Sequence, residues 1–150
     1  MELPGELAFV SAIAKATESW RHAWVINSHG LALVADDDGS WWVGRGLQTA
    51  RPMLGDLRMA LPMLELSYVR VSQVLAEQLV PGQVGPPLGA LVRIALGWPT
   101  DYWPGLALRW LEEGFSSEEV IDELVVLTQA KERSQPLRHQ TLRVWKRRRS

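Results

Sequence analysis

A group of three acidic residues is the part of the chain that most resembles a metal-binding loop. Asp36, Asp37 and Asp38 precede Gly39, and carboxylates are the ligands that Ca²⁺ and Mg²⁺ prefer. A calcium-binding helix–loop–helix places a Glu at the twelfth loop position, but that position counted from Asp36 is Leu47. An Asp-Gly pair between two apolar runs is also a strong signal for a hairpin turn. We therefore expect a solvated turn here and no metal site.

Three histidines are the remaining candidates for metal binding or proton transfer, namely His22, His29 and His139. They lie far apart in the sequence, and no pair has the spacing of metal ligands on one helix. Gly44-Arg45-Gly46 lacks the rest of the fingerprints of nucleotide-binding loops. We expect no cofactor and no catalytic centre, and therefore a protein that is not an enzyme.

One pair of residues has the spacing of a nuclease motif. Arg133 and His139 are separated by five residues. This spacing resembles the motif of the HEPN ribonucleases, small helical proteins with an Arg and a His four to six residues apart. The resemblance implies that Arg133 and His139 cleave phosphodiesters in a dimer. It covers seven residues of this chain, and Pro136 departs from the continuous helix that should carry both side chains. Ribonuclease activity is therefore a third hypothesis.

The end of the chain is strongly basic. Residues 131–150 contain eight Lys and Arg and one Glu, a balance of +7, whereas residues 1–130 contain eight Lys and Arg and sixteen Asp and Glu, a balance of −8. Cations in the tail, residues 143–150, could neutralise phosphates, and a Trp among them could stack on a base. The candidate nucleic-acid contacts are Arg143, Trp145, Lys146, Arg147, Arg148 and Arg149. The same charges could instead stabilise a helix C-terminus or bind an acidic protein.

Eight tryptophans are many for 150 residues, and two of them are adjacent. Neighbouring residues on a strand point to opposite faces, so one of Trp41 and Trp42 should face the core and the other should face outward. Exposed Trp side chains are enriched at protein interfaces. We expect a partner-binding site made by Trp41 or Trp42 together with the acidic residues Asp36, Asp37 and Asp38.

The elements that position these residues can be predicted from the periodicity of the apolar positions. Short β-type runs separated by turn residues predict two hairpins or a meander near residues 23–45. A helix is expected over residues 4–20, and an interrupted helical segment over residues 47–80, with a competing strand interpretation for residues 64–71. Residues 81–87 are rich in Pro and Gly and should break the chain.

Residues 88–147 carry the clearest helical signals. Apolar stripes recur at helical spacing, and Gly97 and Gly114 follow two of them as expected C-terminal glycines. Ser116 and Glu119 have the spacing of a capping box, in which the Ser hydroxyl accepts the backbone N–H of the Glu. A last helix should begin at Ser134-Gln135-Pro136.

These elements predict a mainly helical α+β fold in which a small antiparallel sheet packs against five or six helices. We expect one domain over residues 1–150, with an N-terminal α/β part (1–80), a hinge (81–87) and a C-terminal helical part (88–147). The chain contains no cysteine and no apolar run long enough to span a membrane. We therefore expect a cytoplasmic protein without membrane contacts.

The sequence favours a protein-binding module, such as a bacterial immunity protein, an antitoxin-like protein or a subunit of a complex. This hypothesis depends on the excess aromatic residues, the acidic body and the absence of a recognisable catalytic set. The alternative is a nucleic-acid-binding protein that uses the basic tail. A homodimer is compatible with either hypothesis.

Overall fold

The computed structural model describes residues 20–26, 30–36, 38–45, 50–79 and 81–149. The contacts within the chain divide it into two compact units. The first unit consists of residues 1–63 and 75–87, and the second consists of residues 64–74 and 88–150. The helix predicted over residues 4–20 lies outside the described residues except for Trp20, which belongs to a strand.

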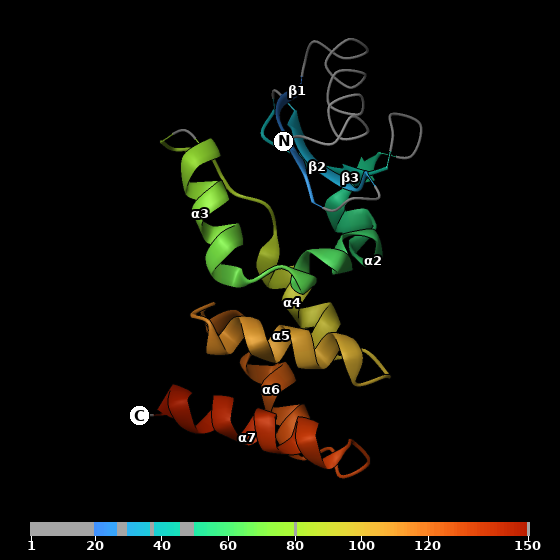
Figure 1. The fold of residues 1–150 in the computed structure, drawn as a ribbon, viewed down its shortest axis with the longest axis vertical. Helices are drawn as coiled ribbons and strands as arrows, with labels where there is room; N and C mark the ends of the chain where they lie inside the picture. The colour runs from blue at the N-terminus through green and yellow to red at the C-terminus, as the bar shows by residue number, and fades with distance from the viewer. Residues whose placement is uncertain (1–19, 27–29, 37, 46–49, 80, 150) are drawn as a thin grey trace. The chain divides into compact units, whose positions relative to one another are not determined.

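The first unit contains an antiparallel sheet with the strand order β1-β2-β3-β4 (Figure 1). The strands are β1 (Trp20–Val25), β2 (Ala32–Asp36), β3 (Trp41–Gly44) and the short β4 (Arg51–Pro52). This arrangement confirms the small antiparallel sheet predicted near residues 23–45. The β1–β2 pairing is irregular between Trp20 and His22, where the register shifts.

The strand β2 is the best-buried element of the sheet. Its residues Ala32, Leu33, Val34 and Ala35 are each at most 1% exposed. Both faces of the strand are therefore covered, which explains why its sequence is continuously apolar and does not alternate with polar residues.

Short helices follow the sheet. These are η2 (Met53–Gly55), α2 (Leu57–Ala60) and η3 (Leu61–Glu65), and they lead to the longer α3 (Tyr68–Gln78). The interrupted helical segment predicted for residues 47–80 is therefore present from Met53 to Gln78. Arg51 and Pro52 form β4 instead, and residues 47–49 and 80 lie outside the described residues.

The structure favours the helical interpretation of residues 64–71 over the strand interpretation. The Arg109 guanidinium donates to the carbonyl oxygens of Leu64 at 2.9 Å and Leu66 at 3.2 Å, and Trp110 Nε1 donates to Leu66 O at 2.9 Å. Leu64 belongs to η3 and Tyr68 begins α3, so these side-chain donors satisfy carbonyl groups at the junction of two helices.

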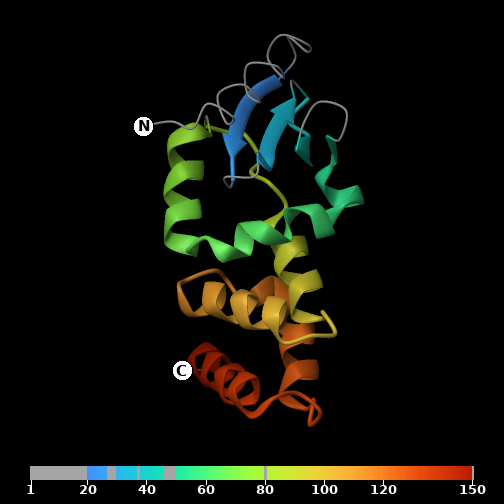
Figure 2. The same cartoon turned by 45° about the vertical axis from the view of Figure 1, so that its right-hand side comes forward.

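The second unit is helical (Figure 2). Its further helices are α4 (Leu88–Leu96), α5 (Tyr102–Glu112), η4 (Glu118–Val120), α6 (Ile121–Thr128) and α7 (Gln135–Arg149). In both views α7, drawn in red, lies next to α5 and α6. The fully buried side chains of the second unit include Leu91, Leu96, Leu108, Trp110 and Leu124. With α2–α7 and one small sheet in the described chain, the mainly helical α+β prediction is confirmed.

The helix α4 ends at Leu96 and Gly97 follows it, as predicted, but Gly97 lacks the conformation of a C-terminal glycine. Gly97 does not adopt a positive φ, whereas Gly114, after α5, has a φ of +113° as expected for a C-terminal glycine. The last turn of α4 is closed by further helical bonds, because the N–H groups of Gly97 and Trp98 donate to Arg93 O at 3.3 Å and to Ala95 O at 3.1 Å. A left-handed glycine is not needed where backbone N–H groups satisfy these carbonyls in this way. The loop that follows is held by the Arg133 guanidinium, which binds the carbonyl oxygens of Trp98, Pro99 and Thr100.

The predicted capping box is not formed. The Ser116 hydroxyl accepts the N–H of Glu118 at 3.4 Å and not that of Glu119. The helix begins with the 3-10 turn η4, so Glu119 does not occupy the position that the motif requires. Its carboxylate instead lies beside Gly89 of α4, where an added Cβ would clash with Glu119 Oε2.

In the part of the chain that the structure describes, no helix has the length and apolar character needed to cross a membrane.

Candidate interaction surfaces

A hairpin turn joins β2 and β3, as predicted, and Asp36, Asp38 and Gly39 take part in it. The backbone N–H groups of Asp38 and Ser40 donate to Asp36 Oδ1 at 3.0 and 2.9 Å, and Trp42 Nε1 donates to Asp36 Oδ2 at 3.0 Å. Gly39 has a φ of +83°, which the turn requires and which glycine adopts without strain. Both carboxylate oxygens of Asp36 therefore serve the turn itself.

These hydrogen bonds also lower the pKa of the Asp36 carboxyl group. Desolvation acts to raise the pKa of Asp36, but the hydrogen bonds from Trp42 and from the backbone of Ser40, Asp38 and Gly39 together outweigh it. The pKa of Asp36 therefore lies below its ordinary value.

The structure shows which tryptophan of the adjacent pair faces the core. Trp41 is 8% exposed, and its Nε1 donates to Val84 O at 3.0 Å. Trp42 is half-buried. Of the predicted contact residues, Trp42 and Asp36 are half-buried and Asp38 is exposed, so these three can still contribute to a contact surface. Asp37 lies outside the described residues. Partner binding by this surface stays a prediction.

The basic end of the chain is helical as far as Arg149. The helix α7 begins after Ser134, whose hydroxyl accepts the N–H of Leu137 at 3.3 Å. Leu137, Thr141 and Val144 are buried, and α7 packs through this stripe against α5 and α6. The cations are therefore held on an ordered helix whose inner side is fixed.

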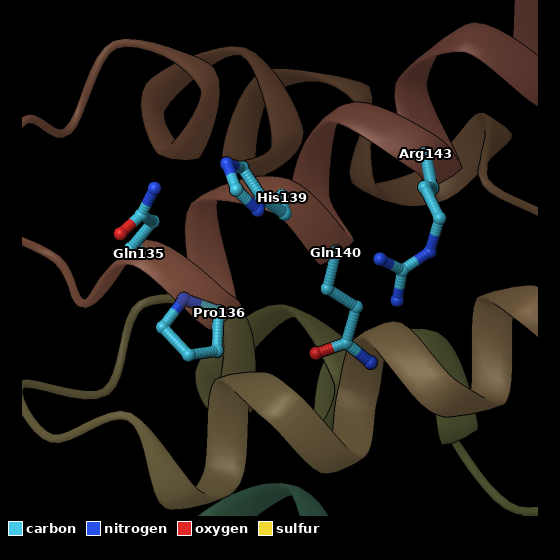
Figure 3. Close-up of a pocket in the computed structure, with 5 residues that line it drawn as sticks. All are labelled: Gln135, Pro136, His139, Gln140 and Arg143. Atoms are coloured by element: carbon cyan, nitrogen blue, oxygen red, sulfur yellow. The ribbon is translucent and has the colours of Figure 1, made fainter.

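One side of α7 is bound to α5 through Glu112. Gln140 Nε2 donates to Glu112 Oε1 at 3.0 Å and to Gly105 O at 3.1 Å, and Arg143 lies 4.0 Å from the same carboxylate. Arg147 donates to Glu112 O at 3.4 Å. In Figure 3 the Gln140 side chain points toward the neighbouring helix, consistent with these hydrogen bonds.

An open depression of about 600 Å³ lies along the same side of α7. Its lining residues are Gln135, Pro136, His139, Gln140 and Arg143 (Figure 3). The Arg143 side chain remains 60% exposed there despite its ion pair. A partner that reaches this depression would meet a cation and an imidazole.

The side of α7 opposite its buried stripe, which we call the outer face of α7, consists of Arg138, His139, Leu142 and Lys146. His139 lies at its edge and also lines the depression. All four residues are exposed, and the apolar Leu142 is 42% exposed. Residues three and four positions apart are neighbours on a helix surface, so Arg138, His139 and Lys146 surround Leu142. The sequence interpretation, which counted only charges, missed Leu142; its position off the stripe of Leu137, Thr141 and Val144 was the signal.

The tryptophan in the basic segment is already covered by a cation. Trp145 is half-buried, and the Arg148 guanidinium lies 4.2 Å from the centre of its ring. A cation over an indole ring is stabilising. A base could stack on this face of Trp145 only after Arg148 moves, and the side chain of Arg149 is not described.

Arg133, one member of the nuclease-like pair, has a structural role. Besides the three carbonyl groups after α4, its guanidinium lies 3.3 Å from Asp101 Oδ1, and its side chain is only 12% exposed. Asp101 Oδ2 accepts the N–H of Ser134 at 3.2 Å. Arg133 thus closes the loop before α5 onto the start of α7, whereas His139 is exposed on α7. Cleavage by this pair stays a prediction.

The remaining histidines, His22 and His29, give no further candidate site among the described residues. His22 belongs to β1 and His29 lies outside the described residues. Within the described ranges no group of three His, Asp or Glu side chains has the geometry of a metal site.

Comparisons with protein-family models, with curated proteins and with solved structures find no match for this chain. Its function must therefore be inferred from its own surfaces.

Proposed function

We propose that this chain is a protein-binding module, and that the outer face of α7 binds an acidic surface of a partner protein. The observation that supports this proposal is the exposure of Leu142 among Arg138, His139 and Lys146. Protein interfaces combine an apolar centre with a polar rim, and Arg is enriched in them. An immunity protein, an antitoxin-like protein or a complex subunit would use such a surface.

The outer face is suited to binding because its scaffold is already ordered. The buried stripe of Leu137, Thr141 and Val144 fixes the helix, so little conformational entropy is lost when a partner binds. The charges of the partner would be complementary to this face, which would speed association at low salt.

A second candidate function is nucleic-acid binding through the same helix. It is favoured by the exposed cations of α7, which include Arg138, Arg143 and Lys146, since phosphate contacts by Lys and Arg provide most non-specific affinity. Two observations make it the weaker candidate. Leu142 occupies the centre of the face, and Arg148 covers a face of Trp145.

A comparison of captured proteins tests the proposed function. The chain and its Leu142→Asp variant are used as baits in extracts of the cells that make the protein. Val126→Asp, on the outside of α6, is the matched control, because Val126 is also an exposed apolar residue, at 66%. We expect a protein that is retained by the wild type and by the control and is lost from Leu142→Asp. The purified protein should then bind the wild-type chain with an affinity that falls at high salt.

Two results would decide against protein binding at this face. One is capture of the same proteins by all three baits. The other is retention of RNA or DNA by purified wild-type chain, with loss of that affinity on changing Arg138 and Lys146 to Gln and no loss in Leu142→Asp.

A further inference from the structure

A second surface of the same unit has the opposite charge. It is a hollow of about 490 Å³ at the start of α6. The residues that line it are Arg93, Glu118, Glu119, Ile121, Asp122 and Glu123. Ile121 is the only apolar residue in this lining and is half-buried. The hollow therefore has an apolar element within a mainly acidic rim.

The single cation of the hollow is used inside the chain. Arg93 Nε lies 3.5 Å from Glu123 Oε1, and the guanidinium donates to Glu119 O at 2.6 Å. The carboxylates of Glu118, Glu119 and Asp122 are on exposed residues, and none forms an ion pair with a cation among the described residues. The hollow thus keeps an excess of negative charge.

The hollow and the outer face of α7 are complementary in both respects. The outer face has an apolar side chain, Leu142, that projects among Arg138, His139 and Lys146. The hollow has an apolar side chain, Ile121, that is recessed among carboxylates. Opposite charges around an apolar contact fix the register of an interface and reject partners of like charge.

We infer that the outer face of α7 binds the acidic hollow at the start of α6 of a second copy of this chain. This inference rests on the proposed function and names the acidic partner. The two surfaces do not satisfy each other within one copy, because Leu142 remains 42% exposed. A contact between two different surfaces either forms twice in a two-fold dimer or extends into a ring or chain.

The expected association is sensitive to salt. Exposed charges are screened beyond about 10 Å at 0.1 M ionic strength, and one apolar side chain contributes only part of the affinity. Self-association should therefore be clear at about 20 mM salt and much weaker at about 300 mM salt.

Sedimentation velocity of two charge-reversal variants tests the inference. Lys146→Glu changes the outer face, and Asp122→Lys changes the hollow; both residues are exposed. We expect the wild type to self-associate at low salt. Each variant alone should self-associate at least about tenfold more weakly, because like charges then oppose each other. An equimolar mixture of the two variants should form a one-to-one complex, since each retains the surface that the other has lost.

Control variants are available on α3. Arg70→Glu and Glu77→Lys reproduce the two changes in net charge at exposed residues outside both surfaces. They should self-associate as the wild type does. Equal weakening by Arg70→Glu and Lys146→Glu would show a general charge effect and overturn the inference.

The self-association and the proposed function can fail separately. A wild-type chain that stays monomeric at low salt, or a variant mixture that forms no complex, overturns the inference. If Leu142→Asp nevertheless loses a different captured protein, the proposed function stands and only the identity of the partner was wrong.

Discussion

At the scale of single residues, the two adjacent tryptophans differ in what their side chains contact. Trp41 is buried and bound to the carbonyl of Val84, whereas Trp42 is half-buried and bound to the carboxylate of Asp36. The first bond reaches across 43 residues and holds the irregular segment 81–87, whereas the second spans six residues within one hairpin. The same substitution should therefore lower the free energy of unfolding more at Trp41 than at Trp42.

We expect Trp41→Ala to lower the free energy of unfolding by about 3–5 kcal/mol, since a large buried ring leaves a cavity. Trp42→Phe, which removes the indole N–H and replaces the half-buried indole by a smaller ring, should cost less, about 1–2 kcal/mol. Urea denaturation monitored by circular dichroism measures both. Similar losses for Trp41→Ala and Trp42→Ala would contradict the assignment of Trp41 as the core residue.

Asp101 makes the stability of the second unit depend on pH. The hydrogen bond with Ser134 is the largest influence on its carboxyl group, and with the nearby Arg133 it outweighs partial desolvation and lowers the pKa. In the unfolded chain the group takes up a proton near its ordinary pKa, and in the folded chain only at lower pH. The unfolded chain then binds more protons, so stability is lost as pH falls from about 4 through the folded pKa.

The variant Asp101→Asn should therefore lose less stability than the wild type between about pH 6 and about pH 3. Thermal denaturation at several pH values measures this difference. Asp122→Asn is the control, because Asp122 is exposed and has no ion pair among the described residues. If the stability of Asp101→Asn depends on pH as strongly as that of the wild type, the role assigned to this carboxyl group is refuted.

At the scale of elements, the packing of α4 on η4 depends on a missing side chain. Gly89 is buried in α4, and a Cβ at that position would meet the Glu119 carboxylate. Glycine within a helix is less favourable than alanine by about 1 kcal/mol, so this position trades helix stability for a close approach. The contact involves the far end of a flexible side chain, which can move at some cost.

This trade predicts non-additive substitutions. Gly89→Ala should stabilise the chain more in a Glu119→Ala background than in the wild type, because the new methyl group then displaces no carboxylate. The difference should reach about 0.5–1 kcal/mol in a double-mutant cycle measured by denaturation. Strict additivity of the two substitutions would show that Glu119 does not restrict Gly89.

At the scale of the whole molecule, the chain divides into two compact units, and the described part of each contains fully buried apolar side chains. Leu33 and Val43 belong to the first unit, and Leu108 and Leu124 belong to the second. Regions that are packed separately open with different free energies.

Hydrogen exchange measured by mass spectrometry should reveal this division. Trp41→Ala should accelerate exchange in β2 and β3 and leave α6 and α7 at their wild-type rates, whereas Leu124→Ala should do the reverse. Equal acceleration of α7 by both substitutions would mean that the two units unfold as one.

The sequence by itself determined the class of the fold and the place of most elements. Apolar periodicity and turn residues are local properties, and they predicted the hairpins near residues 23–45 and the helices between residues 88 and 147. The Asp-Gly turn was predicted for the same reason, because its hydrogen bonds join residues at most four positions apart, apart from the Trp42 contact.

Only the tertiary structure decided which of these residues are buried and which are exposed. The roles of Trp41, Arg133 and Asp101 depend on partners 32 to 43 residues away in the sequence, and no local pattern reports such contacts. The basic end of α7 was visible as charge alone. The structure showed that the helix is fixed on one side and exposes Leu142 on the other. Exposure is set by what packs against a residue, and that packing is a property of the whole fold.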